Sequence, residues 1–198
     1  MQLDIDLIRN LLEKERKKGL DYDQNLSHQS LRKAAVLVPL VCIDGEWELL
    51  FTRRAQSLKN HRGQVSFPGG GEECNDQSII DTALRETYEE IGLEKQHIKL
   101  IGLMPDFVTI SDYVVTPVVS LVKWPVPLKI SGEEVDRVFS IPISFLKNKK
   151  NWEERIYTHP SGWYGSVIFY NLYDGELLWG ISAKITLEFI RIIGDLLE

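Results

Sequence analysis

The chain has 198 residues, 43% of them hydrophobic and 26% charged, which suits one domain of generous size with a real core. The formal net charge is −6, so the composition implies no general basic surface for nucleic acid. A phosphate ligand would need a local basic patch or a bridging cation. Cys42 and Cys74 are the only cysteines, which excludes a four-cysteine metal site and argues against a disulfide framework.

The two ends of the sequence bear on localisation. The first ten residues, MQLDIDLIRN, contain acids where a signal peptide has a basic leader, and no apolar run approaches the length of a membrane span. The C-terminal DLLE differs from the peroxisomal SKL type of signal. We therefore expect a cytoplasmic protein with no membrane partner, and the sequence leaves open whether it forms a homodimer.

The N-terminal segment predicts an amphipathic helix over residues 3–18, with Gly19 as a stop signal. The apolar residues at helical spacing are Leu3, Leu7, Ile8, Leu11 and Leu12. We expect this helix to dock on the domain, although a helix that binds a partner protein has the same pattern. Residues 1–31 are thus predicted to form a helix and connector, and residues 32–198 a single domain.

From Ala34 onward the pattern is typical of a sheet. AAVLVPLVCI is a β-type apolar run, DGE predicts a hairpin turn, and WELLFTRR alternates. Further strands are predicted at 97–104, 113–122, 135–141, 153–159 and 166–173, and helices at 78–91, 143–150 and 182–197. Strands outnumber helices, which predicts an α/β or α+β domain with a mixed β-sheet sandwiched between helices.

The segment 63–93 combines a glycine cluster with an acidic helix, predicted to begin near residues 76–78 and to end at Gly92. Asp81 and Arg85, four residues apart, can pair on the flank of this helix. One face of the helix should pack on the core, and it comprises Ile80, Leu84, Thr87 and Ile91.

Glu86, Glu89 and Glu90 gather on the opposite side of this helix. A solvated surface is the ordinary explanation, but like charges at these spacings repel one another and no lysine on the helix relieves them. The glycines at 69–71 lie in a predicted loop before the helix, where they allow positive φ or close backbone approach. Three carboxylates beside such a turn suit Mg²⁺, which is held by carboxylates, waters and substrate phosphates.

The stretch GEECNDQSIIDTALRETYEEIGL, residues 71–93, resembles the Nudix box, whose pattern is G-x5-E-x7-R-E-U-x-E-E-x-G-U with U aliphatic. The R-E-x2-E-E-x-G-L core matches in full. Thr87 stands where an aliphatic residue is usual, and Gln77 replaces the first glutamate. With a loop one residue longer, counted from Gly70, Asp76 falls on that position instead.

A second stretch of sequence indicates one branch of this family. LFTRRAQSLKNHRGQVSFPGG, residues 50–70, resembles the signature upstream of the box in coenzyme A pyrophosphatases, L-L-T-x-R-[SA]-x3-R-x3-G-x3-F-P-G-G. Phe51 for Leu and Lys59 for Arg are the differences. Segments 115–119, 134–142 and 178–183 follow in the expected order. The resemblance therefore covers about residues 32–193 and implies the Nudix fold.

The resemblance implies hydrolysis of a nucleoside diphosphate linked to another group. For this branch, coenzyme A or acyl-CoA is cut to 3′,5′-ADP and (acyl-)4′-phosphopantetheine. It also implies Mg²⁺ or Mn²⁺, because divalent ions bridge carboxylates and phosphate and lower the pKa of the attacking water. The implied metal ligands are Glu86, Glu89, Glu90 and Gly70, and the three glutamates are also implied to be catalytic.

Other roles follow less directly from the resemblance. In many Nudix enzymes a glutamate from a distant loop is the base, and Glu133 or Glu134 of SGEEVD can play that part, although a solvated loop explains the turn as well. Arg85 is expected to tie the helix to the loop. A basic cluster beside the catalytic loop, for which an ordinary charged hairpin is the alternative, comprises Arg53, Arg54, Lys59, His61 and Arg62.

Substrate contacts are expected from Arg54, Lys59 and Arg62, which suit a substrate with an extra 3′-phosphate, and from Gly69 and Gly70. The aromatic residues that could stack an adenine, or pack in the core instead, are Trp163, Tyr164 and Trp179. Two other functions remain open. One is a Nudix hydrolase for NADH, ADP-ribose or a dinucleoside polyphosphate, and the other is a non-catalytic Nudix-fold module that binds a ligand.

Overall fold

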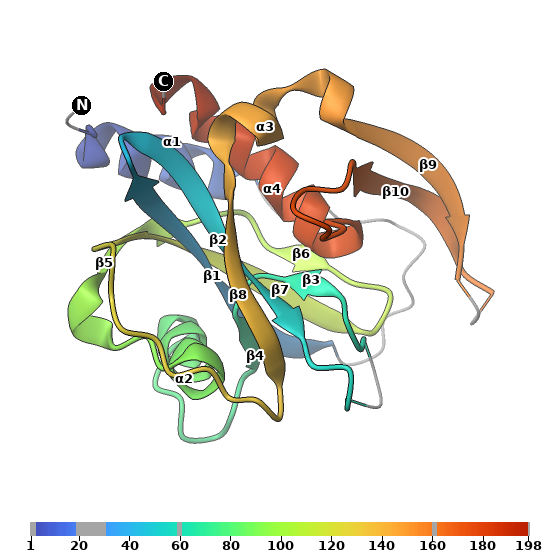
Figure 1. The fold of residues 1–198 in the computed structure, drawn as a ribbon, viewed down its shortest axis with the longest axis horizontal. Helices are drawn as coiled ribbons and strands as arrows, with labels where there is room; N and C mark the ends of the chain where they lie inside the picture. Colours follow the sequence, from blue (N-terminus) through green and yellow to red (C-terminus); the bar gives the residue numbers. More distant parts are fainter. Residues whose placement is uncertain (1–2, 19–30, 59–60, 160–161, 198) are drawn as a thin grey trace.

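The computed structural model describes residues 3–18, 31–58, 61–159 and 162–197. Its main sheet comprises β1 (Arg32–Ile43), β2 (Glu46–Arg54), β3 (Val65–Ser66), β4 (Gly69–Gly71), β5 (Ile98–Leu103), β6 (Phe107–Val108), β7 (Tyr113–Val122) and β8 (Val135–Pro142) (Figure 1). The helices are α1 (Ile5–Arg16), α2 (Ile79–Ile91), α3 (Ile143–Lys147) and α4 (Gly180–Ile193). A separate hairpin consists of β9 (Trp152–Thr158) and β10 (Tyr164–Tyr170), and 3-10 turns occupy Lys95–His97, Lys149–Asn151 and Gly194–Leu196.

The main sheet is mixed, as predicted. Its strand order is β3-β2-β1-β7-β5, with β4 on β1, β6 on β7 and β8 on β2. β1 and β7 run parallel, and the other pairs are antiparallel. The predicted DGE turn forms at Asp44 and Gly45, whose φ values of 50° and 88° are those that a tight two-residue hairpin loop requires.

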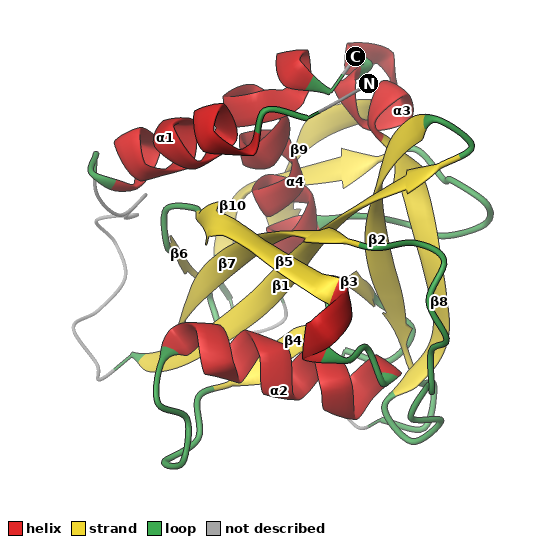
Figure 2. Ribbon diagram, turned by 90° about the vertical axis from the view of Figure 1, so that its left-hand side faces the viewer, coloured by secondary structure: helices red, strands yellow, loops and turns green. Residues whose placement is uncertain are grey.

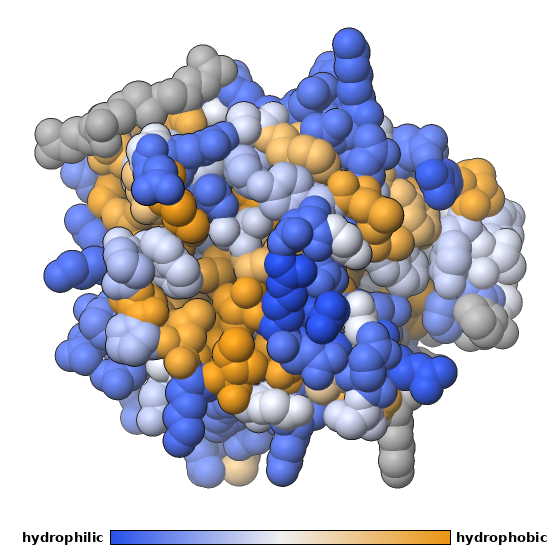
Figure 3. All heavy atoms as spheres, in the orientation of Figure 1, coloured by the Kyte–Doolittle hydropathy of each residue, from blue (hydrophilic) through white to orange (hydrophobic). Residues whose placement is uncertain are grey.

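Side chains of β1 alternate between two apolar layers. Leu40 faces the layer that contains α1, α3 and α4, whereas Val41 faces the layer beneath α2. Figure 2 shows α2 on one side of the sheet and the other three helices on the opposite side. The segment 123–130 packs on the α2 layer through Trp124, Val126 and Leu128. Apolar surface remains visible on this side, beside the hydrophilic band in Figure 3.

Helix α1 docks on the domain, as predicted. Asp4 caps its first turn by accepting the N–H of Leu7. Ile8 and Leu12 are fully buried and belong to the core cluster that also includes residues of α3 and α4. Leu12 lies against Gly102 of β5, where a Cβ would approach it to 3.1 Å. Within the described ranges, no helix is long and apolar enough to cross a membrane.

Two arginines on neighbouring strands share one buried carboxylate. Arg53 of β2 and Arg137 of β8 are register partners, so their like charges would repel one another. Glu176, whose side chain is 6% exposed, accepts hydrogen bonds from Arg53 at 3.1 Å and from Arg137 at 2.9 Å. Asp174 pairs with Arg137, and Asp136 lies 3.9 Å from Arg53. The turn that carries Glu176 is thereby tied to the sheet.

We expect Glu176→Gln to lower the free energy of unfolding by about 2–3 kcal/mol, because it leaves two adjacent guanidinium groups without their shared buried anion. Asp174→Asn removes the same charge from the same turn, but this side chain is 65% exposed. It should therefore cost less than about 1 kcal/mol. Urea unfolding of both variants measures the difference, and equal losses would contradict the assignment of Glu176 as the anchor.

Candidate functional site

Helix α2 begins and ends where the sequence predicts. Ser78 caps its N-terminus: the Ser78 hydroxyl accepts the N–H of Asp81 at 3.2 Å and donates to the Asp81 carboxylate at 2.7 Å. Gly92 ends the helix with a left-handed φ of 67°, a conformation that favours glycine. Leu84, Thr87 and Ile91 are buried as predicted, whereas Ile80 is only partly buried.

The predicted pair between Asp81 and Arg85 does not form, because the Asp81 carboxylate faces the helix cap. Arg85 turns instead to the preceding loop and makes a two-pronged contact with Asp76 at 3.0 and 2.9 Å. It also donates to the carbonyl of Gly71 at 2.9 Å. Hydrogen bonds from Arg85 hold the pKa of Asp76 well below its usual range. The expectation that Arg85 ties helix to loop is confirmed, and Asp76 is its partner.

The glycines at 69–71 form a strand rather than the predicted loop. Gly69, Gly70 and Gly71 pair antiparallel with residues 34–36 of β1. The predicted close backbone approach is confirmed at two of them. At Gly69, where φ is 152°, a Cβ would lie 2.2 Å from the carbonyl oxygen of Ala35. At Gly70 a Cβ would lie 2.5 Å from the carboxyl group of Glu86.

The three glutamates of α2 do not share one solvated face. The side chain of Glu90 is 2% exposed and points toward the sheet, that of Glu86 is 17% exposed, and that of Glu89 is 55% exposed. Glu90 accepts the N–H of Gly69 at 3.2 Å, and Arg54 lies 3.8 Å away. Glu86 and Glu89 both accept hydrogen bonds from Arg85.

Burial changes the acidity of two of these carboxyl groups. It raises the pKa of Glu90 to about 8, against the opposing effects of the Gly69 N–H and the Arg54 charge. Burial likewise raises the pKa of Glu86, partly offset by Arg85. The negative charge of Glu134 contributes to both increases. Like-charge repulsion among these glutamates thus adds to the effect of burial on Glu86 and Glu90.

Backbone contacts hold Glu134 near α2. The N–H groups of Lys129 and Ser131 donate to the last carbonyls of the helix, those of Ile91 and Glu90. The carbonyl of Glu134 accepts the N–H of Ala55, just after β2. The segment 129–135 is thus attached to both elements that carry the site. Of the two glutamates in the SGEEVD turn, Glu134 is the one whose charge acts on Glu86 and Glu90.

The predicted basic cluster is divided by the alternation of β2. Arg54 points toward Glu90, while Arg53 points to the opposite face and binds Glu176. Arg62 is exposed and makes no ion pair with a described residue, and the His61 ring bonds to Gln64 at 2.9 Å. Lys59 lies outside the described residues.

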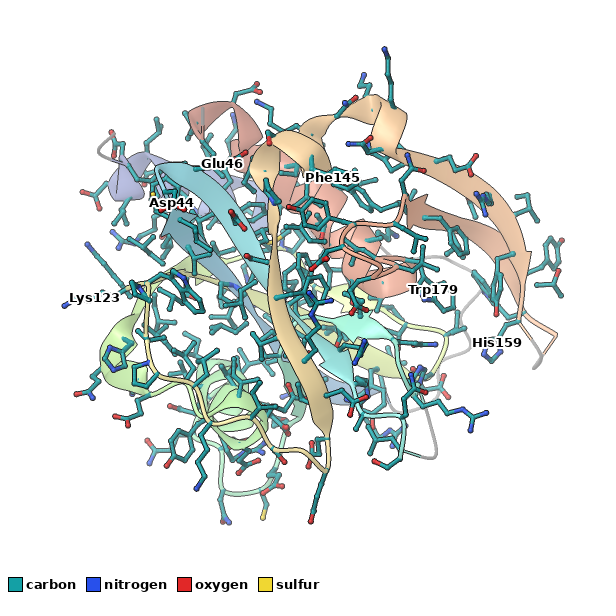
Figure 4. All side chains as sticks on the ribbon, viewed as in Figure 1. Asp44, Glu46, Lys123, Phe145, His159 and Trp179 are labelled. Carbon is teal, nitrogen blue, oxygen red and sulfur yellow. The ribbon has the colours of Figure 1, made fainter. Side chains whose placement is uncertain are left out.

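The aromatic residues predicted to stack an adenine lie apart from the glutamates. Trp179 stacks on Phe169 with ring centroids 5.4 Å apart, and its edge contacts Tyr157 at 5.6 Å (Figure 4). Trp179 is partly buried and packs with these two rings outside the core, so both alternatives for this residue stay predictions. Tyr164 is 75% exposed on β10, and the ring of Trp163 covers Gly165.

The donor set fits a hard divalent cation. Glu86, Glu89 and Glu90 of α2 supply carboxylate oxygens, Glu134 lies on the segment attached to the same helix, and Arg54 is the cation that faces Glu90. In the part of the chain that the structure describes, no three acidic, histidine or cysteine side chains already surround one point. Arg85 holds Glu86 and Glu89 in hydrogen bonds, so a metal ion would compete with it for both carboxylates.

Comparison with known protein families identifies the family of this chain. The NUDIX domain family matches residues 31–160. The chain belongs to the Nudix family. The Nudix box is therefore the loop and helix described above, with Asp76 bound to Arg85 and Gln77 exposed.

Two relatives and one solved structure illustrate how far the Nudix likeness extends. A protein called uncharacterized Nudix hydrolase NudL from Yersinia pestis (strain Pestoides F) is 37% identical over 154 residues, which are 78% of this chain and 76% of the relative. The protein of the same name from Yersinia pseudotuberculosis serotype O:1b (strain IP 31758) gives the same values. A MutT/nudix family protein from Enterococcus faecalis has a TM-score of 0.54 at 16% identity, covering 87% of this chain and 66% of its own. This last likeness concerns the fold.

Substitution of Asp76 tests whether its ionic contact with Arg85 stabilises the fold. We expect Asp76→Asn to lower the free energy of unfolding by about 2 kcal/mol near neutral pH, because Arg85 loses a charged, 5% exposed partner. The folded pKa of Asp76 lies below its unfolded value, so this stability is present above the unfolded pKa and is lost as pH falls. The difference between wild type and variant should be full above about pH 5 and shrink below about pH 4.

Asp81→Asn is the matched control, since Asp81 lies on the same helix but contacts Ser78 rather than Arg85. Thermal melts of both variants from pH 3 to pH 7 measure the effect. A loss for Asp76→Asn that does not depend on pH would contradict the ionic assignment.

Proposed function

We propose that this Nudix protein is a divalent-metal-dependent hydrolase that cleaves the diphosphate linkage of coenzyme A or acyl-CoA to 3′,5′-ADP and (acyl-)4′-phosphopantetheine. The observation that carries the diphosphatase part is the burial of two glutamates of the Nudix box, Glu86 and Glu90, beside the closely packed strand β4, with Glu134 on a segment attached to the same helix. A diphosphate is itself negatively charged, so it binds next to these carboxylates only with cations between them.

The proposed reaction assigns a role to each of the predicted site residues. Glu86, Glu89 and Glu90 would hold the cation together with the backbone of Gly70, and Glu134 would accept the proton of the attacking water. Arg54, which lies 3.8 Å from Glu90, would bind a phosphate oxygen of the substrate, with Lys59, Arg62 and the backbone of Gly69 as further contacts. Bound Mg²⁺ or Mn²⁺ would neutralise phosphate charge and lower the pKa of the water nucleophile.

The choice of coenzyme A rests on the signature at residues 50–70. This stretch runs through β2 and β3 into β4, so its two ends carry Arg54 and Gly70 to the glutamates of α2. The names of the Yersinia relatives state a Nudix hydrolase and no substrate. Because coenzyme A is an intracellular cofactor, we propose that the enzyme acts in the cytoplasm.

Turnover of coenzyme A, NADH and ADP-ribose, compared side by side with Mg²⁺ or Mn²⁺, tests the proposal. We expect coenzyme A to be cut fastest, to 3′,5′-ADP and 4′-phosphopantetheine identified by mass spectrometry, and EDTA to stop the reaction. Glu90→Gln should lower kcat by at least about a hundredfold while the circular dichroism spectrum stays native, because it removes the most buried of the three box glutamates.

Each outcome separates one part of the proposal from another. NADH or ADP-ribose cleaved far faster than coenzyme A would overturn the substrate and leave the diphosphatase. No cleavage of any diphosphate, with binding retained, would show a ligand-binding module. Full activity of Glu90→Gln would contradict the assignment of Glu90 as a metal ligand.

Two adjacent glycines offer a matched pair of variants. A Cβ at Gly70 would lie 2.5 Å from the Glu86 carboxyl group, whereas a Cβ at Gly71 would have no atom within 4 Å. The far end of Glu86 can move at little cost to folding, so Gly70→Ala should displace a ligand while the protein stays folded. We expect Gly70→Ala to lower kcat or metal affinity at least about tenfold and Gly71→Ala less than about twofold. Equal activity of both variants, measured across a Mn²⁺ titration, would remove Glu86 from the metal site.

A further inference from the structure

A pocket lies at the end of the sheet away from the glutamates, where the parallel strands β1 and β7 separate. Their last paired residues are Leu40 and Leu121. Beyond this point β1 continues into its hairpin with β2, and β7 ends at Val122 and leaves the sheet. The divergence opens a pocket of about 430 Å³. Crevices at the carboxyl ends of neighbouring parallel strands are common ligand sites in sheet proteins.

The wall of this pocket is mostly apolar. Its apolar lining residues are Trp47 of β2, which is 8% exposed, Trp124 just after β7, Leu121 and Val122. Cys42, an exposed free thiol, also lines the pocket and is the register partner of Trp47. The volume and the apolar lining fall in the range of small-molecule sites.

The rim of the pocket is basic, although the whole chain carries a net charge of −6. Lys99 and Lys123 line it, together with His97 and Gln96, and no lining residue is acidic. Neither lysine makes an ion pair with a described residue. Lys149 and Lys150, at the exposed turn before β9, likewise make no ion pair with a described residue, whereas Lys18 and Lys33 pair with Glu15 and Glu72. The acidic residues of the nearby hairpin, Asp44 and Glu46, are not among the lining residues.

This pocket is far from the proposed catalytic site. From Ala35, which pairs with Gly70, to Cys42 is seven residues of one strand, or about 23 Å. A ligand in this pocket would therefore not block the diphosphate site.

We propose that this pocket binds a medium-chain fatty carboxylate, with the alkyl chain between Trp47 and Trp124 and the carboxylate at Lys99 and Lys123. The apolar wall disfavours a wholly polar ligand, because polar groups placed against it would lose their hydrogen bonds to water. An alkyl chain makes no such bonds and displaces water from the wall without this loss. The unpaired lysines select an anionic head over a neutral or cationic one. The depression is open to solvent on its outer side, and its volume falls in the range of small-molecule sites. The inference stands independently of the proposed diphosphatase activity.

Thiol protection tests the proposal in the full chain. In a Cys74→Ser background Cys42 is the only thiol, and its reaction with a maleimide can be followed by mass spectrometry. We expect saturating decanoate, kept below its micelle concentration, to slow labelling at least fivefold. Decanol should protect far less at the same concentration, and decyltrimethylammonium should not protect.

Charge variants test the head-group contact. Lys99→Glu combined with Lys123→Glu should abolish protection by decanoate, whereas Lys149→Glu combined with Lys150→Glu, the same charge change at the exposed turn Lys149–Asn151, should leave it intact. Lys99→Gln with Lys123→Gln, which adds no repulsion, should weaken it at least threefold. The comparison of decanoate with decanol uses the unaltered lysines and so remains decisive if a variant does not fold.

Three results would overturn the proposal: no protection by decanoate, equal protection by the cationic amphiphile or by decanol, or equal loss in the control variant. Protection that appears only with a rise in molar mass in light scattering would assign the surface to a second copy of the chain instead.

Discussion

The contact of Arg85 with Asp76 and Gly71 holds the site together. The guanidinium group lies on α2, and its partners lie on the strand and loop that precede the helix. Because its five donors are planar and fixed in direction, this one side chain can fasten a carboxylate, a carbonyl and two glutamates at once. The second polar contact between β4 and α2 is the hydrogen bond from the Gly69 N–H to Glu90. Together these contacts fix the helix, and with it Glu86, Glu89 and Glu90, against the strand.

The close packing of β4 against α2 determines how deeply the glutamates of the site are buried. Gly69 and Gly70 come so close to β1 and Glu86 that no side chain fits there, and the space that remains is filled by the carboxylates themselves. Glu90 is consequently buried, with one backbone N–H and a more distant arginine as its polar neighbours. Burial of an acid with so little compensation is unfavourable for its charged form. A divalent cation bound beside Glu90 would favour the charged form of this carboxyl group.

The sequence predicted the elements better than it predicted their contacts. Periodicity and caps located α2 from Ser78 to Gly92, and the apolar alternation located the long strands β1, β2 and β7. The short strand β4 was not predicted, since three glycines carry no strand signal and pair with β1 only because of tertiary contacts. The side-chain partner predicted for Arg85 was wrong for a similar reason. Spacing along a helix suggested Asp81 for Arg85, but a loop carboxylate outside the helical pattern lay nearer.

The same limit applies to the division of Arg53 and Arg54. Adjacent in sequence, they read as one basic cluster, yet the pleat of β2 sends one to Glu176 and the other to Glu90. Strand alternation alone implies this split, so it could have been inferred once WELLFTRR was assigned to a strand. The acidic partner of each arginine could not, because Glu176 and Glu90 are brought to β2 by separate turns of the chain. Charge runs in sequence therefore indicate function only after the element that carries them has assigned each side chain to a face.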